Sequence, residues 1–235
     1  MTADLTTAGW LDLGLERRDS AYLLQRCADL LDETGADGRA RLRWYVSTDA
    51  AVVLGRGQRT AAAVPGHDVL QRPSGGGAVL MDDDLLSLDV VLPTGHPWLG
   101  EADLGHVFDP IGAAWAAALT SLGVPDVLIH TGPATATRLG PEDRRPLAEV
   151  CYASLGRGEI TTGGRKIVGL SQRRRRQGAL IQCGLLRTWK PDPLIQALGL
   201  EAARAPIEAA AVGLDNVLDR SVSDASIIQL VRAHL

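Results

Sequence analysis

Apolar positions recur at helical spacing in several stretches of the chain. In residues 19–31 (DSAYLLQRCADLL) they fall three and four positions apart, and Asp19 or Ser20 is available to cap the first turn. Residues 104–122 form a long alanine-rich stretch that Gly123 is expected to end. The tail alternates short helical pieces, the last of them over residues 225–234. The spacing therefore predicts helices in these three places.

Short apolar or alternating runs predict strands between the helices. They lie at residues 42–46 (LRWYV), 51–54 (AVVL), 85–92 (LLSLDVVL), 159–162, 166–170 and 179–186. Gly163 and Gly164 are placed to join the 159–162 and 166–170 strands as a hairpin, whereas residues 131–146 lack a period and predict a surface loop. Strand pairs with interspersed helices indicate an α+β fold, in which helices flank a mixed or antiparallel sheet.

Composition and charge exclude several classes of protein. The 235 residues include 24 Lys and Arg against 28 Asp and Glu, a net charge of −4 that argues against a nucleic-acid binder. No apolar run is long enough for a membrane helix, and the start lacks the basic and apolar segments of a signal peptide. Three cysteines, at 27, 151 and 183, form no disulfide framework or zinc motif. These features predict a cytoplasmic protein without membrane contact.

A glycine-rich segment at residues 72–79 (RPSGGGAV) is the first candidate for chemistry. Gly75, Gly76 and Gly77 let the backbone approach a ligand closely, and their N–H groups can cradle an anion. Arg72 adds a cation and Ser74 a hydroxyl donor. The spacing matches neither a P-loop nor a dinucleotide fingerprint. The segment is either a ligand-binding loop or only a tight connection.

Lys166 and Cys151 are candidates because of their reactivity. Lys166 lies in an apolar strand, where an ammonium either meets an anion or extends from the strand end to water. Cys27, Cys151 and Cys183 all fit small buried hydrophobes, but Cys151 follows a loop and precedes the lysine strand. A neighbouring cation would lower its pKa and make it nucleophilic.

Three charged segments are weaker candidates. Arg56, in the turn at residues 54–58, either points to the same pocket or lies exposed on a plain turn. Asp82 begins a run of three aspartates that either holds magnesium or is a solvated loop. The four arginines at 173–176 either lie on a solvated face or attract a phosphate or an acidic partner.

In this order the segments resemble the lipoate–protein ligase A and octanoyltransferase family, whose catalytic domain is related to that of biotin–protein ligases. The matching motifs are Leu-Gly-Arg-x-Gln at 54–58, Arg-x-Ser-Gly-Gly-Gly-Ala-Val at 72–79 and Gly-Arg-Lys-Ile-x-Gly at 164–169. The resemblance covers residues 40 to 190 and implies the family's α+β catalytic domain. Biotin ligases themselves fit less well, because their glycine–arginine loop is only superficially similar to residues 55–57.

The resemblance implies an enzyme that attaches a lipoyl or octanoyl group, through an amide bond, to a lysine of a lipoyl domain. Such domains occur in 2-oxoacid dehydrogenase complexes and in the glycine cleavage H protein. Lys166 would then stabilise the acyl carbonyl and phosphate. The residues expected around the acyl-adenylate or acyl thioester are Arg56, Arg72, Ser74, Gly75, Gly76, Gly77, Val79 and Gly169.

Two mechanisms occur in the family, and the sequence is compatible with both. Lipoate ligases use ATP and Mg²⁺ to make an acyl-AMP, the mechanism we place first, with Asp82 as the candidate metal ligand. Some octanoyltransferases need no cofactor and pass octanoate from acyl carrier protein through a cysteine thioester. Cys151 stands at the position of their nucleophile, in a Cys-aromatic pair, whereas the triple glycine and Arg56 are more typical of ligases.

Departures from the family pattern raise a third possibility. Met81 stands where a histidine is usual, Gln71 where a second arginine precedes the loop, and Leu85 where ligases carry Asn or Asp. These changes motivate a non-catalytic paralogue that binds a lipoyl domain or an acyl chain. The tail after Leu186 is too short for a sizeable accessory domain. Residues 1–235 are therefore expected to be one catalytic domain, either self-sufficient or dependent on a separate accessory subunit.

Overall fold

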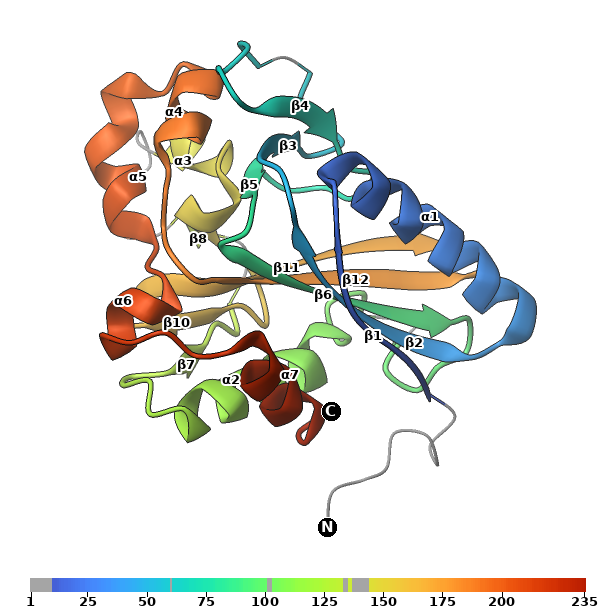
Figure 1. Cartoon of the computed structure of the whole chain (residues 1–235). Coiled ribbons are helices and arrows are strands. Elements are labelled where there is room, and N and C mark those ends of the chain that lie inside the picture. Colours follow the sequence, from blue (N-terminus) through green and yellow to red (C-terminus); the bar gives the residue numbers. More distant parts are fainter. Residues whose placement is uncertain (1–9, 60, 101–102, 133–134, 137–143) are drawn as a thin grey trace.

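A seven-stranded sheet forms the centre of the molecule in the computed structural model, which describes residues 10–59, 61–100, 103–132, 135–136 and 144–235 (Figure 1). From edge to edge its strands are β1 (Trp10–Arg18), β2 (Ala40–Ser47), β6 (Leu85–Pro93), β12 (Gly178–Leu186), β11 (Arg165–Arg175), β10 (Ile160–Thr162) and β7 (Leu128–Ile129). β1 and β2 are parallel, and the other neighbouring pairs are antiparallel. The predicted α+β fold with a mixed sheet is confirmed.

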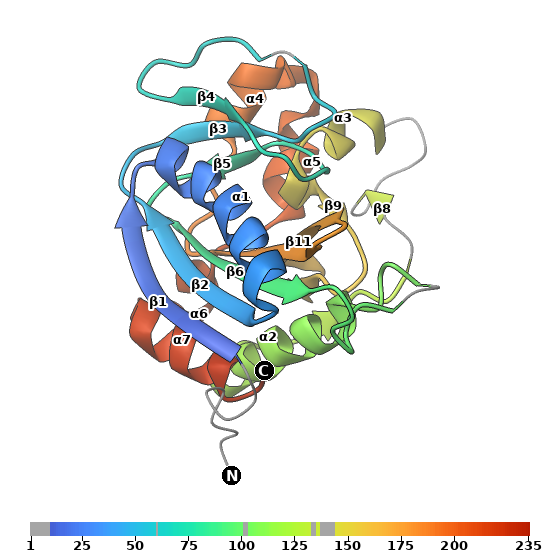
Figure 2. The same cartoon turned by 90° about the vertical axis from the view of Figure 1, so that its right-hand side faces the viewer.

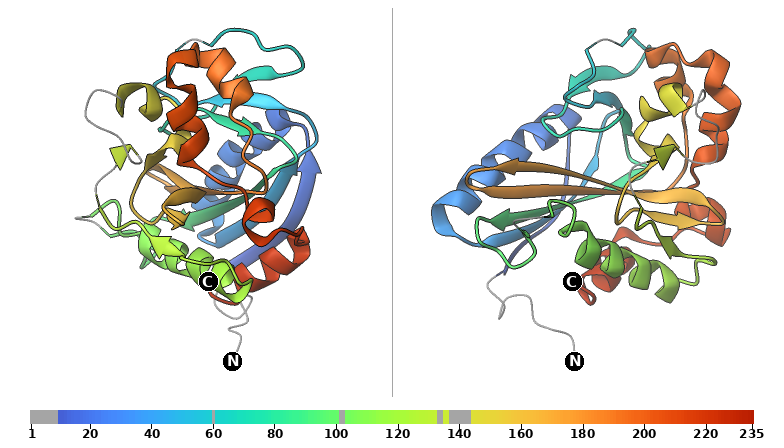
Figure 3. Two further views of the ribbon diagram at one scale, coloured as in Figure 1. Left: turned by 90° about the vertical axis from the view of Figure 1, so that its left-hand side faces the viewer. Right: turned by 180° about the vertical axis from the view of Figure 1, so that it is seen from behind.

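Each face of this sheet has its own cover (Figures 1 and 3). Helices α2 (Phe108–Ser121) and α7 (Asp224–Arg232) pack against one face. Helix α1 (Ser20–Asp37) and a small sheet of β3 (Ala51–Leu54), β4 (Asp68–Gln71) and β5 (Val79–Met81) lie over the other. Figure 2 shows α1 crossing this second face. The small sheet is thus held above the large one.

Shorter elements complete the second face beside the small sheet (Figure 1). Along the chain they are β8 (Thr135–Ala136), α3 (Arg144–Ala148), the 3₁₀ turn η1 (Cys151–Ala153), β9 (Ser154–Leu155), α4 (Asp192–Leu198), η2 (Glu201–Ala203) and α5 (Arg204–Ala210). Helix α6 (Leu214–Leu218) precedes α7. Among the described residues, no helix combines the length and apolar character needed to cross a bilayer.

Strand β6 shows how the two faces differ. Leu86, Leu88, Val90 and Leu92 point into the main core with α2 and α7. Because side chains alternate along a strand, the intervening positions face α1 and the small sheet. Two of these, Ser87 and Asp89, are polar and buried. The second face of the sheet is therefore the one that carries polar chemistry.

The predicted helices and strands are present with shifted ends, whereas β1, β4 and β7 were not predicted. α1 has Asp19 as its N-cap but continues past residue 31 to Asp37, where Gly38 in a left-handed conformation ends it. α2 begins at Phe108 rather than 104, because residues 104–107 form turns. Strand β1 was missed although Leu11, Leu13 and Leu15 alternate with Asp12, Gly14 and Glu16; Leu13 and Leu15 are exposed, and the register shifts beside Gly14.

The glycine hairpin and the predicted loop have different outcomes. Thr162 pairs with Arg165 across Gly163 and Gly164, which both have positive φ, so the hairpin is confirmed. The predicted loop at 131–146 includes residues 133–134 and 137–143, which lie outside the described residues. Its described part contains β8 and the start of α3, so the loop prediction is wrong there.

Candidate active site

A pocket of about 480 Å³, including space open to solvent, lies between the large sheet and the small one. Its floor is a row of positions on four adjacent strands: Tyr45, Ser87, Gly184 and Gly169. The walls come from α1, the small sheet and η1. They include Leu24, Val53, Arg72, Val79, Met81, Leu85, Cys151 and Tyr152. The pocket is mainly apolar, which suits an acyl chain.

The glycine-rich loop at 72–78 is tied to the chain around Cys151. Ala78 accepts a hydrogen bond from the Cys151 amide at 2.8 Å and donates its own amide to Glu149 O at 2.7 Å. A Cβ at Gly77 would lie 2.7 Å from Ala148 O, so only glycine permits this approach. The absence of a side chain at Gly77 therefore has a physical reason, because the loop packs directly against the backbone around Cys151.

Arg72 braces this loop from inside. Its side chain is buried, and its guanidinium donates to Gly75 O at 2.8 Å and Gly77 O at 2.7 Å. Ser74 is also buried and donates to Gln182 Oε1 at 2.8 Å. The amide N–H groups of Gly75, Gly76 and Gly77 donate to no other described residue. In this structure the glycine amides of the loop are therefore donors left free by the described residues, whereas the Arg72 guanidinium donates in part to the loop carbonyls.

A β-bulge aims Lys166 at the pocket side of the sheet. Thr161 pairs with Lys166, but the preceding Ile160 pairs with Val168, so Ile167 is an extra residue in β11. Ile167 and Val168 both enter the main core. Lys166 instead faces Gly169, where a Cβ would meet its Cε at 3.3 Å. Without the bulge, regular alternation would place the lysine on the core face.

Lys166 is buried, with 1% of its surface exposed, so it does not extend to water. Its Nζ forms an ion pair with Glu159 Oε2 at 2.7 Å. It also donates to Cys151 O at 2.8 Å and to Ser154 O at 3.1 Å. The anion expected for a buried lysine is therefore Glu159, with two backbone carbonyls beside it.

Cys151 begins η1 and is half-buried on the pocket wall. Its Sγ lies 4.0 Å from Lys166 Nζ. The next residue, Tyr152, is buried, and its hydroxyl donates to Gly184 O at 2.7 Å. Burial, followed by the neighbouring Cys151, raises the pKa of Tyr152 well above its ordinary value, so the phenol stays neutral. The thiol thus has one nearby cation and an apolar pocket in front of it.

The other predicted positions fall partly in the pocket and partly outside it. Val79 and Gly169 line the pocket, as do the family departures Met81 and Leu85. Arg56 is exposed and lies in a neighbouring groove that also contains Arg72 and Arg173. Gln71 donates to Gln58 O at 2.8 Å and so supports the turn that carries Arg56.

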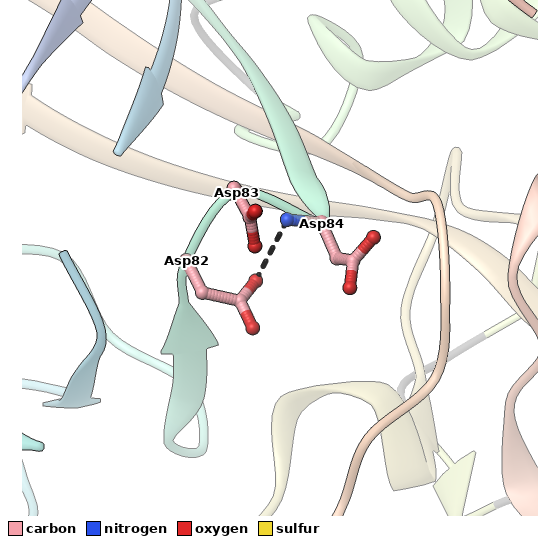
Figure 4. A group of neighbouring side chains, drawn as sticks. All are labelled: Asp82, Asp83 and Asp84. Carbon is pink, nitrogen blue, oxygen red and sulfur yellow. Dashed lines mark hydrogen bonds between the residues drawn. The ribbon is translucent and has the colours of Figure 1, made fainter. Parts of the chain in front are cut away.

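Asp82 lies in a different cavity. Asp82, Asp83 and Asp84 offer oxygens within 4.8 Å of one another, and the Asp84 amide donates to Asp82 (Figure 4). Burial raises the pKa of Asp82, and Lys190 forms an ion pair with Asp84. Their cavity is lined by Asp49, His67 and Lys190 rather than by residues of the glycine loop. The cluster has the donors for a hard cation, but the structure does not bring it together with Cys151 and Lys166.

Sequence reasoning missed Glu159 and Gln182. Glu159 lies in the Gly-Arg-Gly-Glu stretch before β10, and only its partner Lys166 identifies it. Gln182 alternates with apolar residues in β12 and joins Ser74 to the sheet. A polar residue inside an otherwise apolar strand was the available signal for Gln182, whereas Glu159 precedes β10 and gave no such signal.

Comparisons with known proteins identify the family of the chain. A model of the lipoyl protein ligase A/B catalytic domain matches residues 21–235. Among curated proteins, octanoyltransferase LipM of Moorella thermoacetica is 32% identical over 222 residues, which cover 88% of this chain and 77% of that protein. The match extends beyond the three motifs to nearly the whole chain.

Solved structures share the fold. The bi-partite lipoate protein ligase of Thermoplasma acidophilum, described with its E2 lipoyl domain, has a TM-score of 0.69 at 18% identity and covers 95% of this chain and 80% of its own. Lipoate-protein ligase A bound with ATP has a TM-score of 0.61 at 20% identity, with coverages of 95% and 82%. At these identities the two structures establish a common architecture.

Proposed function

Because this chain belongs to the lipoyl protein ligase A/B catalytic-domain family, we propose that it transfers an octanoyl group through a thioester on Cys151. The family membership makes it an enzyme of lipoate or octanoate transfer. The finer proposal rests on one observation: a half-buried cysteine faces an apolar pocket with a buried lysine ammonium 4.0 Å from its sulfur. It reverses the order in which sequence alone ranks the two mechanisms.

In the first step an octanoyl chain occupies the pocket and the Cys151 thiolate attacks its thioester carbonyl. The donor's sulfur takes the proton that Cys151 gave up and leaves as a thiol, and the new bond joins the octanoyl carbonyl to Cys151 Sγ. The free amides of Gly75, Gly76 and Gly77 are available to stabilise the oxyanion. Lys166 supplies positive charge beside the sulfur. Arg72 and Ser74 keep the loop in place for this step.

In the second step a lysine amine of the acceptor attacks the Cys151 thioester. An amide forms as the bond to Cys151 Sγ breaks, and one proton of the amine passes to the leaving sulfur, which regenerates the cysteine thiol. The proposed acceptor is a lipoyl domain, because the related T. acidophilum ligase is described with an E2 lipoyl domain. The proposed donor is octanoyl acyl carrier protein. Neither step uses ATP or a metal.

An acyl-AMP ligase is the second candidate, and one observation favours it. Arg56, Arg72 and Arg173 line a groove that shares Leu24 and Arg72 with the acyl pocket, and guanidinium groups suit phosphate. Asp82, the candidate Mg²⁺ ligand, faces another cavity. The ligase route therefore has a place for phosphate but separates its metal candidate from the acyl pocket.

The two routes differ in their donors, so one assay compares them. The purified protein is incubated with a lipoyl domain and one of two donors. The first is octanoyl acyl carrier protein, and the second is lipoate together with ATP and Mg²⁺. The mass of the lipoyl domain is then measured by mass spectrometry. We expect an octanoyl gain with the carrier protein alone, and an octanoyl adduct on the enzyme when the acceptor is omitted. Cys27→Ser, which changes a buried thiol that does not line the pocket, should keep both adducts.

Three outcomes contradict the thioester route. Mass gain only with lipoate and ATP would establish the ligase reaction instead. Full transfer by Cys151→Ser would exclude the cysteine as nucleophile. Binding of the lipoyl domain with no gain from either donor would identify the non-catalytic paralogue.

A further inference from the structure

Glu159 is a buried carboxylate whose oxygens are all engaged. Its side chain is almost inaccessible to water. Oε2 accepts the Gly156 amide at 2.7 Å and pairs with Lys166 Nζ, while Oε1 accepts the Leu170 amide at 2.9 Å. Two backbone donors therefore fix the carboxylate beside Lys166. A carboxylate held in this way can in turn fix the direction of its cation.

Lys166 has no N–H left for a ligand in this arrangement. An ammonium has three donors, and the three acceptors here are Glu159, Cys151 O and Ser154 O. Two of those acceptors are main-chain carbonyls of the turn that carries the candidate nucleophile. The lysine thus connects a buried carboxylate to the backbone of residues 151–154.

The charged or titratable groups that face Lys166 are few among the described residues. Glu159 comes from the segment before β10, and the Cys151 thiol comes from η1. The ring of Tyr152, also in η1, lies 5.2 Å from Nζ. Because the Tyr152 phenol is held neutral by burial, Glu159 is the counter-charge of the ammonium.

We propose that Glu159 is a positioning residue, which keeps Lys166 charged and holds it against the backbone of residues 151–154 so that Cys151 faces the pocket. The proposal rests on the thioester route. Removing the carboxylate leaves an uncompensated ammonium in a buried site, and burial disfavours the charged form. Lys166 would then lose its proton at lower pH, and the turn would lose its tie.

The main test compares three variants in the first half-reaction. Glu159→Gln removes the charge at nearly the same shape, Glu159→Asp keeps the charge with a shorter reach, and Glu33→Gln removes a carboxylate from a surface pair with Arg26. The rate of octanoyl adduct formation on the full-length protein is followed against pH. We expect a loss on the order of 100-fold for Glu159→Gln, an intermediate rate for Glu159→Asp and no change for Glu33→Gln.

The pH profile separates positioning from mere stability. Activity that needs the charged lysine falls as pH rises through its deprotonation, so the alkaline limb should move to lower pH by about one unit or more in Glu159→Gln. A rate reduced equally at every pH would overturn the proposal, as would a wild-type profile. Thermal unfolding of each variant identifies any that fails to fold, and Glu159→Asp then carries the comparison.

A second readout needs no turnover. Amide hydrogen exchange of residues 151–155 should be faster in Glu159→Gln than in wild type and unchanged in Glu33→Gln, because the clamp on two carbonyls is lost. Unchanged exchange would overturn the proposal. If the wild-type protein forms no octanoyl adduct, the thioester route fails, and the exchange measurement still decides whether Glu159 acts through Lys166.

Discussion

Two clusters of side chains beside the same pocket contain the same four kinds of residue in different arrangements. Each combines a cysteine, a tyrosine, a cation and a carboxylate. The Cys151 cluster consists of Cys151, Tyr152, Lys166 and Glu159, and the Cys27 cluster consists of Cys27, Tyr45, Arg43 and Asp89. Both tyrosines line the pocket. Composition therefore does not distinguish the two clusters, and geometry has to.

In the Cys27 cluster the carboxylate lies directly against the thiol. Cys27 Sγ donates to Asp89 Oδ2 at 3.4 Å, and Arg43 pairs with the same oxygen at 3.1 Å. Burial, followed by the Asp89 carboxylate, raises the pKa of the Cys27 thiol well above its ordinary value. This cysteine stays protonated and out of reach of solvent, as expected of a structural residue.

In the Cys151 cluster the cation lies between the thiol and the carboxylate. Lys166 Nζ is 4.0 Å from Cys151 Sγ and 2.7 Å from Glu159 on its other side. Cys151 is also partly exposed to the pocket. A cation lies near both thiols, since Arg43 Nη1 is 3.8 Å from Cys27 Sγ, but only Cys27 is hydrogen-bonded to a carboxylate among the described residues. The comparison teaches that access and contact with a carboxylate, rather than residue type or a nearby cation, select the candidate nucleophile.

Exchanging each cysteine for serine should separate the clusters most strongly. Cys151→Ser should lower octanoyl transfer on the order of 1,000-fold or more, because a serine hydroxyl is not ionised here. Cys27→Ser should retain transfer within about tenfold, since its thiol does not face the pocket. Transfer rates and thermal unfolding of both variants provide the measurement. Equal losses of transfer would show that the clusters do not differ in role.

Removing each cation should produce opposite kinds of defect. Arg43→Met leaves Asp89 buried without its partner and should lower the free energy of unfolding by about 3–5 kcal/mol. Lys166→Met should instead abolish most octanoyl adduct formation. Denaturant unfolding and the adduct assay on both variants make the comparison. A stable, inactive Arg43→Met would contradict it.

The Arg43→Met defect should also depend on pH. Burial raises the pKa of Asp89 above its ordinary value even with Arg43 present. A carboxyl with a raised folded-state pKa contributes stability below the unfolded pKa and loses it as pH rises through the folded value. The loss in Arg43→Met should therefore be larger at neutral pH than in mild acid. Unfolding measured at both conditions checks the sign.

Alkylation should distinguish the thiols without any substrate. Burial raises the pKa of Cys183 as it does that of Cys27, and both thiols are buried, whereas Cys151 is partly exposed. Iodoacetamide should therefore modify Cys151 at least about 100-fold faster than the other two in the folded protein. Peptide mass mapping after short exposure provides the rates. Comparable labelling of Cys27 would remove the contrast in access.

The smallest effects are expected at the tyrosines. Tyr152→Phe loses a hydrogen bond to Gly184 O, and Tyr45→Phe loses one to Asp89 Oδ1 at 3.3 Å. Each change should cost about 1–2 kcal/mol of unfolding free energy, because a buried partner is left unbonded. Only Tyr152→Phe should also slow adduct formation, since Tyr152 packs on Lys166. An effect of Tyr45→Phe alone on the adduct rate would reverse the assignment.

Much of the fold and part of the site were predictable from local signals. Asp19, Gly38 and the glycine hairpin act within a few residues of themselves, so capping and turn rules locate them. The motifs at 54–58, 72–79 and 164–169 carry the family resemblance, which the family match confirms. Strand β1 was missed although Leu11, Leu13 and Leu15 alternate, and its place at the sheet edge follows only from its pairing with β2.

By itself the sequence determined the elements, the family and the residues able to do chemistry, because periodicity, turn preferences and motif order are local or linear properties. Only the tertiary structure decided which of those residues meet. A bulge at Ile167 turns Lys166 toward the pocket, and Glu159 and Cys151 reach it from separate segments. The same pairing rules place Asp89 on Cys27 and keep Asp82 in another cavity. The arrangement of these charged groups depends on contacts between residues that are far apart in the chain. No local sequence pattern encodes such contacts.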